Sequence, residues 1–214
     1  FYPTTSSAGN MQSDVADYQT YGSGHPNIES WRRSNVDATI KIVSDVIKAT
    51  KPAVVFSVSP APNHQSNYNN LFADVPKWGK EGWVDVIMPQ LYQEIGNPYN
   101  DFIANLSFWS RNSGDADVMI GYGLYKFGDP QYGSAFQSTG ELQRQFQYTR
   151  ANSKVVGHVM YRAETIMNNP IGITQTLKDL YAKPAVMPFL GRSVAADPVA
   201  ATQVMLTGNE LKWN

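Results

Sequence analysis

The sequence of 214 residues predicts an α/β protein with a parallel sheet, and three observations support this class. Four apolar runs of strand length are each followed by a segment with helical spacing, and the units repeat every ~30 to 40 residues. The run from Val84 to Met88 is too continuous for a strand with one face in water, so both of its faces are expected to be covered. The run also ends without a Gly or Asn hairpin. Parallel strands joined by right-handed crossovers explain these observations better than an all-α or all-β fold.

The N-terminal part of the chain predicts a strand end, a loop and a long helix. Residues 1–3, Phe-Tyr-Pro, are typical of a strand that stops at a proline. Residues 11–29 are polar and aperiodic, which indicates a long loop. From about Ser30 to Lys51 an apolar stripe with a period near 3.6 residues predicts a helix, which Pro52 ends.

Two strands and a short helix are expected next. Residues 53–60 predict a buried strand that ends in Ser-Pro, and residues 68–79 predict a short helix. Asp85 lies at the start of the strand 84–88, so we expect a structural role for it rather than a chemical one. Pro89 cannot donate a ladder hydrogen bond, so regular pairing should weaken after this strand.

The remaining sequence predicts three helices, two strands and a separate tail. The helices are 99–112, 141–150 and 172–181, and the strands are 117–122 and 155–161. After Pro184 a linker begins, and residues 200–213 alternate like two short strands around Gly208. We therefore expect one domain over residues 1–184, followed over residues 185–214 by a linker and the first hairpin of a β-sandwich module.

The composition favours a weakly charged ligand. The net charge of −1 arises from 17 basic and 18 acidic residues without long runs of either sign, so neither nucleic acid nor an anionic membrane surface is indicated as a partner. Aromatic residues make up 12% of the chain, which suits stacking on carbohydrate, although a large core would explain them equally well. The absence of cysteine excludes disulfides, thiolate metal sites and a cysteine nucleophile. No apolar run approaches ~18 residues, so no membrane span is predicted.

Polar and aromatic residues follow the predicted strands at the ends where parallel sheets bind ligands. Gln90 and Tyr92 are two residues apart, so both face the same side and can hold sugar hydroxyls or an acetamido group. Glycoside hydrolysis needs two carboxyl groups, ~5 to 5.5 Å or ~6.5 to 9.5 Å apart, and Glu94 and Glu164 are the acids that follow strands. Glu94 is the better catalytic candidate, because Arg162 is near enough to Glu164 to form a structural ion pair. The alternatives are a solvated carboxylate at Glu94 and a packing role for Tyr92.

Other positions are further candidates for binding. Arg32 and Asn35 begin the long helix, and Arg32 either bonds to a structural carbonyl or carboxylate or pairs with a catalytic acid. The three histidines lack the spacing of metal ligands, and the Gly-Tyr-Gly at 121–123 lacks the third glycine of a phosphate loop, so no metal or other cofactor is predicted. The remaining expected sugar contacts, at strand ends or in the loops that follow, are Tyr2, Ser59, Asn63, Tyr122, Tyr125 and Arg162.

Several short sequence motifs at the ends of these units resemble those of the glycosyl-hydrolase-like 10 family, which consists of bacterial proteins with a (β/α)8 barrel. The resemblance covers about residues 1–184 in order. Residues 162–164, Arg-Ala-Glu, depart from the family pattern of small residues, an aromatic and a lysine. The matching segments are Phe1-Tyr2-Pro3, Trp31-Arg32-Arg33 with Asn35-Val36, Val58-Ser59-Pro60, Glu81-Gly82-Trp83-Val84-Asp85, Pro89-Gln90-Leu91-Tyr92, Ile120-Gly121, Leu124-Tyr125-Lys126 and Asn169-Pro170-Ile171-Gly172.

The resemblance implies that this chain supplies about strands five to eight of a TIM-type (β/α)8 barrel. The first half of the barrel and the family's acidic pair are then expected before residue 1, in a longer product. A fibronectin-like domain often follows the barrel in this family, which suits the predicted tail. Strand edges left by the missing half would offer a surface for self-association.

The resemblance also implies a function and a location. A glycoside hydrolase is expected, secreted, periplasmic or on the outer surface, acting on a polysaccharide or oligosaccharide of the bacterial envelope such as peptidoglycan. Tyr92 would then support substrate-assisted cleavage, as a tyrosine does in chitinase-type barrels. The alternative is a non-catalytic carbohydrate-binding or scaffold protein that keeps a glycosidase-like cleft.

Overall fold

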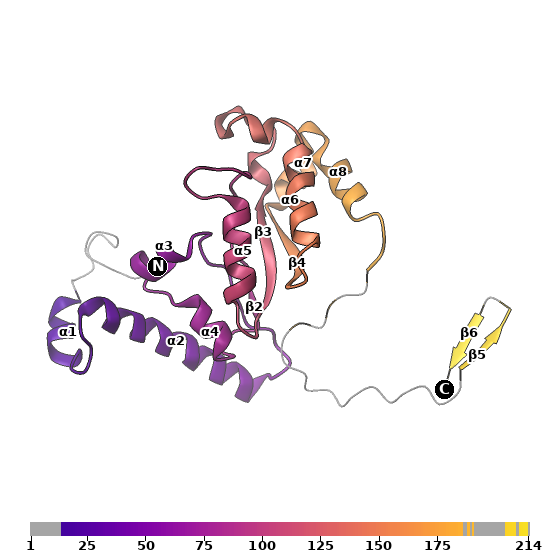
Figure 1. Cartoon of the computed structure of the whole chain (residues 1–214). Coiled ribbons are helices and arrows are strands. Elements are labelled where there is room, and N and C mark those ends of the chain that lie inside the picture. Colours follow the sequence, from indigo (N-terminus) through magenta and orange to yellow (C-terminus); the bar gives the residue numbers. More distant parts are fainter. Residues whose placement is uncertain (1–13, 186–187, 189, 191–203, 209, 214) are drawn as a thin grey trace.

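A four-stranded parallel sheet lies at the centre of the structure (Figure 1). The computed structural model describes residues 14–185, 188, 190, 204–208 and 210–213. Each neighbouring pair of strands is parallel, which confirms the predicted α/β class. The strands lie in the order β1 (Ser57–Val58), β2 (Val86–Ile87), β3 (Asp117–Gly123) and β4 (Val155–Tyr161).

Helices connect consecutive strands, and α2, α3 and α5 begin at side-chain caps. The side chain of Asn27 accepts a hydrogen bond from the Ser30 amide at the start of α2, and Asp101 caps α5 in the same way through the Ala104 amide. Such caps satisfy amide groups that have no partner within the helix. The helices are α1 (Val15–Tyr21), α2 (Ile28–Thr50), α3 (His64–Asn70), α4 (Val75–Lys80), α5 (Phe102–Asn112), α6 (Gly140–Arg150), α7 (Ala163–Asn168) and α8 (Ile173–Leu180).

The core lies between the sheet and the helices. Ile87, Val118 and Ile120 are fully buried and share one hydrophobic cluster with side chains of α4, α5, α6 and α8. Alternation along β4 sends Val159 and Tyr161 to the opposite face, where they are 36% and 51% exposed. Within the described residues, the helices therefore bury one face of the sheet far more completely than the other.

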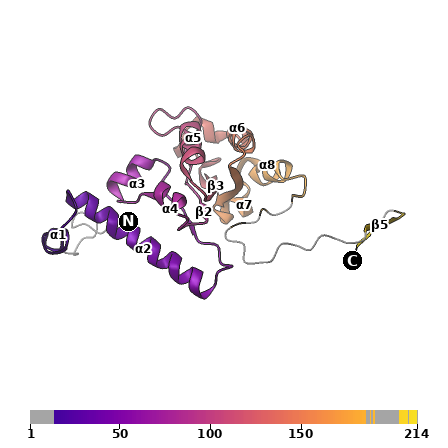
Figure 2. The same cartoon turned by 60° about the horizontal axis from the view of Figure 1, so that its bottom comes forward.

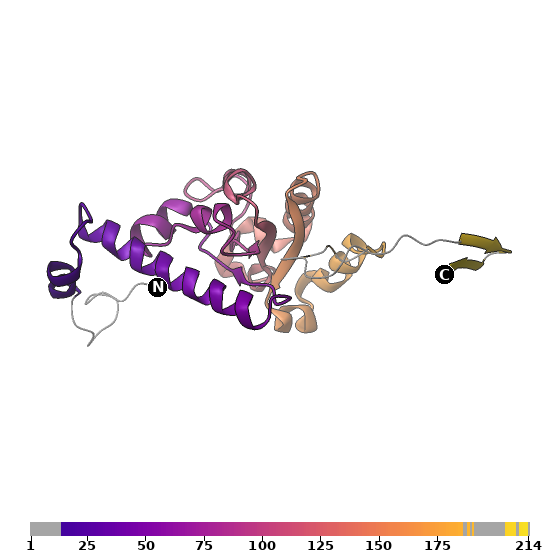
Figure 3. The same ribbon diagram turned by 90° about the horizontal axis from the view of Figure 1, so that it is seen from below.

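The long helix α2 lies beside α3 and α4, as Figures 2 and 3 show from two directions. Asp37 of α2 is buried and accepts hydrogen bonds from the indole nitrogen of Trp78 and from Nζ of Lys77, each at 2.6 Å. Charge-assisted bonds of this kind are stronger than neutral ones. A single carboxylate therefore fixes α2 against α4.

Two predicted helical boundaries are wrong for local reasons. Residues 11–29 were expected to form a loop, but α1 lies within this range and α2 begins at Ile28. No residue of α1 is buried, so its sequence lacks the apolar periodicity from which a helix is predicted. The helix expected over residues 68–79 is two helices, because Phe72 takes a φ of +53° between them and Pro76 occupies the first turn of α4.

The strand expected over residues 53–60 is shorter than predicted. Only Ser57 and Val58 pair with β2, and Val54 and Val55 are exposed. Among the described residues β1 is an edge strand, which explains why the apolar residues before it remain uncovered. The strand 84–88 pairs only at Val86 and Ile87, and both residues are buried as expected.

The C-terminal tail contains the predicted hairpin. β5 (Val204–Thr207) and β6 (Glu210–Trp213) are antiparallel, with Gly208 at a positive φ of 63° in the turn. The hairpin is confirmed, while its membership of a fibronectin-like module and the domain boundary at residue 184 stay predictions. The strand end expected at residues 1–3 lies outside the described residues.

Candidate active site

Three tyrosine rings gather at the carboxyl ends of β2, β3 and β4. Tyr92 follows β2, Tyr125 lies in the short helix η1 (Leu124–Lys126) after β3, and Tyr161 ends β4. The rings of Tyr92 and Tyr161 are nearly parallel, with centroids 6.0 Å apart, and Tyr125 stands edge-on to them at 6.1 and 5.9 Å. These spacings lie in the favourable range for aromatic pairs. We call these three residues the tyrosine cluster.

Glycines of β3 make room for the Tyr92 ring. A Cβ atom added at Gly123 would lie 3.0 Å from Cβ and Cγ of Tyr92, and one at Gly121 would lie 3.0 Å from the carbonyl oxygen of Pro89. The ring therefore packs directly on the backbone of the neighbouring strand. A β-bridge between Gln90 and Gly121 holds the chain in this register beyond the end of β2.

Gln90 and Ser59 meet at the ends of β2 and β1. Nε2 of Gln90 donates to the carbonyl oxygen and to Oγ of Ser59, at 3.2 and 3.3 Å, and Oγ of Ser59 donates to the carbonyl oxygen of Met88. The side-chain amide of Gln90 is thus oriented by Ser59, and its oxygen Oε1 has no hydrogen bond with another described residue. The structure brings these two predicted positions together at the same end of the sheet as Tyr92.

Glu94 organises the loop that follows the tyrosine. Its Oε1 accepts a hydrogen bond from Nδ2 of Asn97 at 2.8 Å. Burial lowers the pKa of Lys126, and the nearby carboxylate of Glu94 opposes that shift. The ammonium of Lys126 lies over the rings of Tyr132 and Phe136, at 5.4 and 5.2 Å from their centroids. Lys126 therefore belongs to the same polar and aromatic surroundings as Glu94.

Glu164 and Arg162 form the expected ion pair, 2.9 Å from Nη2 of the arginine to Oε2 of the glutamate. Both side chains are more than half exposed, so the pair contributes little to stability. With Tyr125, Asp129 and Asn168 they line a pocket of about 250 Å³. Because Tyr125 is shared, this pocket adjoins the tyrosine cluster.

Burial raises the pKa of Tyr92, and the neighbouring Tyr125 and Tyr161 hydroxyls add to the shift. Burial likewise raises the pKa of Tyr125. Both phenols therefore stay protonated at neutral pH and can donate hydrogen bonds to oxygen atoms of a ligand.

Several predicted contacts lie elsewhere. Tyr122 was expected at the crevice, but it lies on the opposite face of β3, 1% exposed, with its hydroxyl hydrogen-bonded to Thr149. Alternation explains this correction, because Tyr122 stands between Gly121 and Gly123, which face Tyr92.

Other predicted contacts serve the structure. The side chain of Asn63 caps α3 by accepting from the Ser66 amide. Arg32 binds both carboxylate oxygens of Asp14, at 2.8 and 2.6 Å, which supports the structural alternative for this arginine. Asn35 lies within α2, apart from the tyrosine cluster in sequence and element, and Tyr2 is not among the described residues.

Sequence reasoning missed Tyr161 and Lys126. Counting alternate positions along β4 from Gly157 would have placed Tyr161 on the face of Tyr92. In the part of the chain that the structure describes, no three histidine, aspartate or glutamate side chains are grouped as a metal site requires. No helix of the described residues is both long and apolar enough to cross a membrane.

Aromatic and amide side chains thus lie at the carboxyl edge of a parallel sheet, which is the edge at which α/β folds bind ligands. The family model described as glycosyl hydrolase-like 10 matches residues 1–136, and the chain belongs to this family.

Two similar proteins are named glycosyl hydrolases. The chain is 33% identical over 207 residues to glycosyl hydrolase YngK of Bacillus subtilis (strain 168), which covers 88% of this chain and 40% of the relative. It is 28% identical over 195 residues to glycosyl hydrolase DigH of Escherichia coli (strain K12), which covers 79% of this chain and 43% of the relative. The chain thus spans about two fifths of the length of these relatives.

Proposed function

We propose that the chain forms about strands five to eight of a (β/α)8-barrel glycoside hydrolase, with β1 to β4 in those places. The family membership supports this architecture, as does the burial of one face of the sheet by helices. In a doubly wound sheet helices cover both faces, whereas in a barrel they surround one face and the strands close around the other. The tyrosine cluster at the carboxyl edge is the observation on which the functional proposal depends.

We propose a neutral or N-acetylated glycan of the bacterial envelope as the substrate, with the protein secreted, periplasmic or on the outer surface. The exposed part of Tyr161 offers an apolar face to a sugar ring. Gln90 has an amide oxygen to accept from a sugar hydroxyl or an acetamido N–H, and the protonated phenol of Tyr92 has a donor. The pocket beside Tyr125 would receive the next sugar unit.

In this proposal the principal catalytic carboxylates come from the part of the relatives' length that these 214 residues do not span. Tyr92 would position the acetamido group or stabilise charge as the glycosidic bond breaks. Glu94 would serve as the acid contributed by this chain, near the ammonium of Lys126.

Binding without hydrolysis is the second candidate. Glu94 already accepts from Asn97, and Glu164 is paired with Arg162, so both candidate acids of this chain have structural partners. A protein with this crevice and no additional acid would hold a glycan and leave it intact.

Full-length protein incubated with peptide-free peptidoglycan strands, chitin oligomers and neutral β-glucans separates the two candidates. Hydrolysis predicts released oligosaccharides by mass spectrometry, with the rate reduced ~100-fold or more in Tyr92→Phe if the phenol acts on the reacting group. The control Tyr99→Phe alters a tyrosine that is 92% exposed and should leave the rate unchanged. Binding without release would favour the second candidate, and absence of both from all three glycans would refute the proposal.

A further inference from the structure

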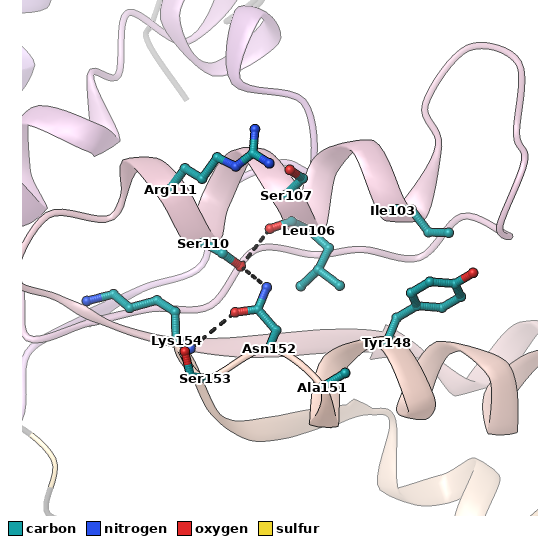
Figure 4. Close-up of a pocket in the computed structure, with 10 residues that line it drawn as sticks. All are labelled: Ile103, Leu106, Ser107, Ser110, Arg111, Tyr148, Ala151, Asn152, Ser153 and Lys154. Atoms are coloured by element: carbon teal, nitrogen blue, oxygen red, sulfur yellow. Dashed lines mark hydrogen bonds between the residues drawn. The ribbon is translucent and has the colours of Figure 1, made fainter.

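A groove of about 470 Å³ lies between α5 and α6, outside the sheet (Figure 4). Its lower rim is formed by residues 151–154, which lead into the first residue of β4. The tyrosine cluster is at the other end of that strand, because Tyr161 is the last of its seven residues. At ~3.3 Å per residue the two places are ~20 Å apart along the strand. The groove is therefore separate from the candidate active site.

One end of the groove is positively charged. Arg111 from the last turn of α5 and Lys154, which directly precedes β4, line it, and no aspartate or glutamate is among the lining residues. Nζ of Lys154 donates to the carbonyl oxygen of Gly114 at 3.0 Å, which leaves its other protons available. The guanidinium of Arg111 has no hydrogen bond or ion pair with another described residue. Either cation would pair with an anionic group of a ligand.

The middle of the groove is a fixed row of polar groups. Nδ2 of Asn152 donates to Oγ of Ser110 at 2.8 Å, and Ser110 donates to the carbonyl oxygen of Leu106. Oδ1 of Asn152 accepts from the backbone amide of Lys154 at 3.1 Å. Figure 4 shows this hydrogen-bonded row between Lys154 at one end and Tyr148 at the other. Hydroxyl and amide groups held in place in this way suit the hydroxyls of a sugar.

The other end of the groove is apolar and aromatic. Tyr148 of α6 is 47% exposed, and its side chain lines the groove together with Ile103 and Leu106 of α5. A half-exposed phenol ring offers a flat face to a sugar ring, as aromatic residues do in carbohydrate sites. The groove thus joins an anion-binding end to a ring-binding end through a polar middle.

We propose that the groove between α5 and α6 binds an oligosaccharide that carries a carboxylate, as a second glycan contact remote from the crevice. Arg111 and Lys154 lie at one end of the groove and Tyr148 at the other (Figure 4), so the carboxylate of one sugar unit pairs with a cation and the ring of another unit lies on Tyr148. Nucleic acid fits less well, because the groove offers two cations rather than an extended basic surface, and the whole chain has a net charge of −1. The proposal concerns binding alone and does not depend on hydrolysis at the crevice.

Calorimetric titration of the full-length protein with three probes tests this site: a galacturonic acid tetramer, an N-acetylglucosamine tetramer and inorganic phosphate. We expect the uronate tetramer to bind and Arg111→Gln or Tyr148→Ala to weaken it ~10-fold, the loss of one charge-assisted pair or one stacking contact. Arg111→Lys should retain part of the affinity, and Lys178→Gln, which removes an exposed charge of α8, should leave it unchanged. Rates on short neutral substrates should be the same in all variants.

Two results would overturn the proposal. One is uronate binding that none of the groove variants changes, which would assign that ligand to another place. The other is phosphate binding as tight as uronate binding, with neither affinity changed by Tyr148→Ala. This result would leave an anion site with no preference for sugar. If the wild-type protein hydrolysed none of the glycans, the proposed hydrolysis would be refuted, and these two binding results would still decide the present proposal.

Discussion

Acidification should destabilise the protein through His158, whose ring lies between the sheet and two helices. Nε2 of His158 is 3.1 Å from Oγ1 of Thr149 and Nδ1 is 2.7 Å from the hydroxyl of Tyr181, while the Phe146 ring packs against the imidazole. Burial lowers the pKa of His158 to about 4, and the positive charge of Arg150 adds to the shift. The imidazole is therefore neutral in the folded protein at pH values where it becomes protonated in the unfolded chain.

The direction and size of the effect follow from the two pKa values. A histidine whose folded pKa is below its unfolded value stabilises the protein fully above the unfolded value of 6.5, and this stability is lost as the pH falls toward 4. The difference between about 4 and 6.5 corresponds to ~3 kcal/mol of unfolding free energy, which partial exposure of the ring reduces to ~2 kcal/mol.

Urea unfolding followed by tryptophan fluorescence between pH 7 and pH 4 measures this contribution. The wild-type protein should lose ~2 kcal/mol more unfolding free energy over this interval than His158→Gln, which cannot titrate. Burial also lowers the pKa of His64, but that histidine is present in both proteins, so the difference between them isolates His158. Parallel pH profiles for the two proteins would refute the reasoning.

Three further substitutions have defined outcomes. Gly79→Ala should destabilise the protein by ~2 kcal/mol or more, because the new Cβ would lie 2.1 Å from a backbone carbonyl oxygen. In the control Gly140→Ala, in α6, the new Cβ meets only a hydroxyl at 3.4 Å, so this change should be neutral or stabilising. Equal thermal midpoints for the two variants would contradict the reasoning. Asp37→Ala should cost ~2 to 3 kcal/mol in urea unfolding, since it leaves a buried indole N–H without its acceptor, and a change below ~0.5 kcal/mol would show that α2 is held by packing alone. Gly123→Ala should displace the Tyr92 ring at a cost of ~1 to 3 kcal/mol and weaken glycan binding; unchanged affinity in titrations would remove Tyr92 from the site.

The sequence patterns that reflect burial on both faces predicted the sheet well. Val155–Tyr161 matches the expected strand, and β3 extends the expected one by one residue. Apolar continuity indicates burial wherever partners lie on both sides, as they do for Val86 and Ile87. It failed at residues 53–55, because apolar continuity does not itself show which strand lies at an edge of the described sheet.

The residues of the candidate site were predicted only in part, because the alternation of side chains along a strand was applied to one strand and not to the others. Period-two alternation was used to place Gln90 and Tyr92 on one side of their strand, but it was not applied along β3 and β4. Applying it there would have exchanged the buried Tyr122 for Tyr161. Contacts between segments far apart in the sequence, such as that of Arg32 with Asp14 or of Gln90 with Ser59, depend on the packing of whole elements and have no local pattern.

The opposed faces of β3 have a consequence for how the protein can change. Ile120 and Tyr122 hold the helices, while Gly121 and Gly123, between and beside them, receive the ring of Tyr92. Residues that pack the core and residues that border the tyrosine cluster thus alternate along one strand. A change of the ring at Tyr92, Tyr125 or Tyr161 leaves Ile120 and Tyr122 in place, so the proposed binding edge can be altered without a direct change in the packing of the core.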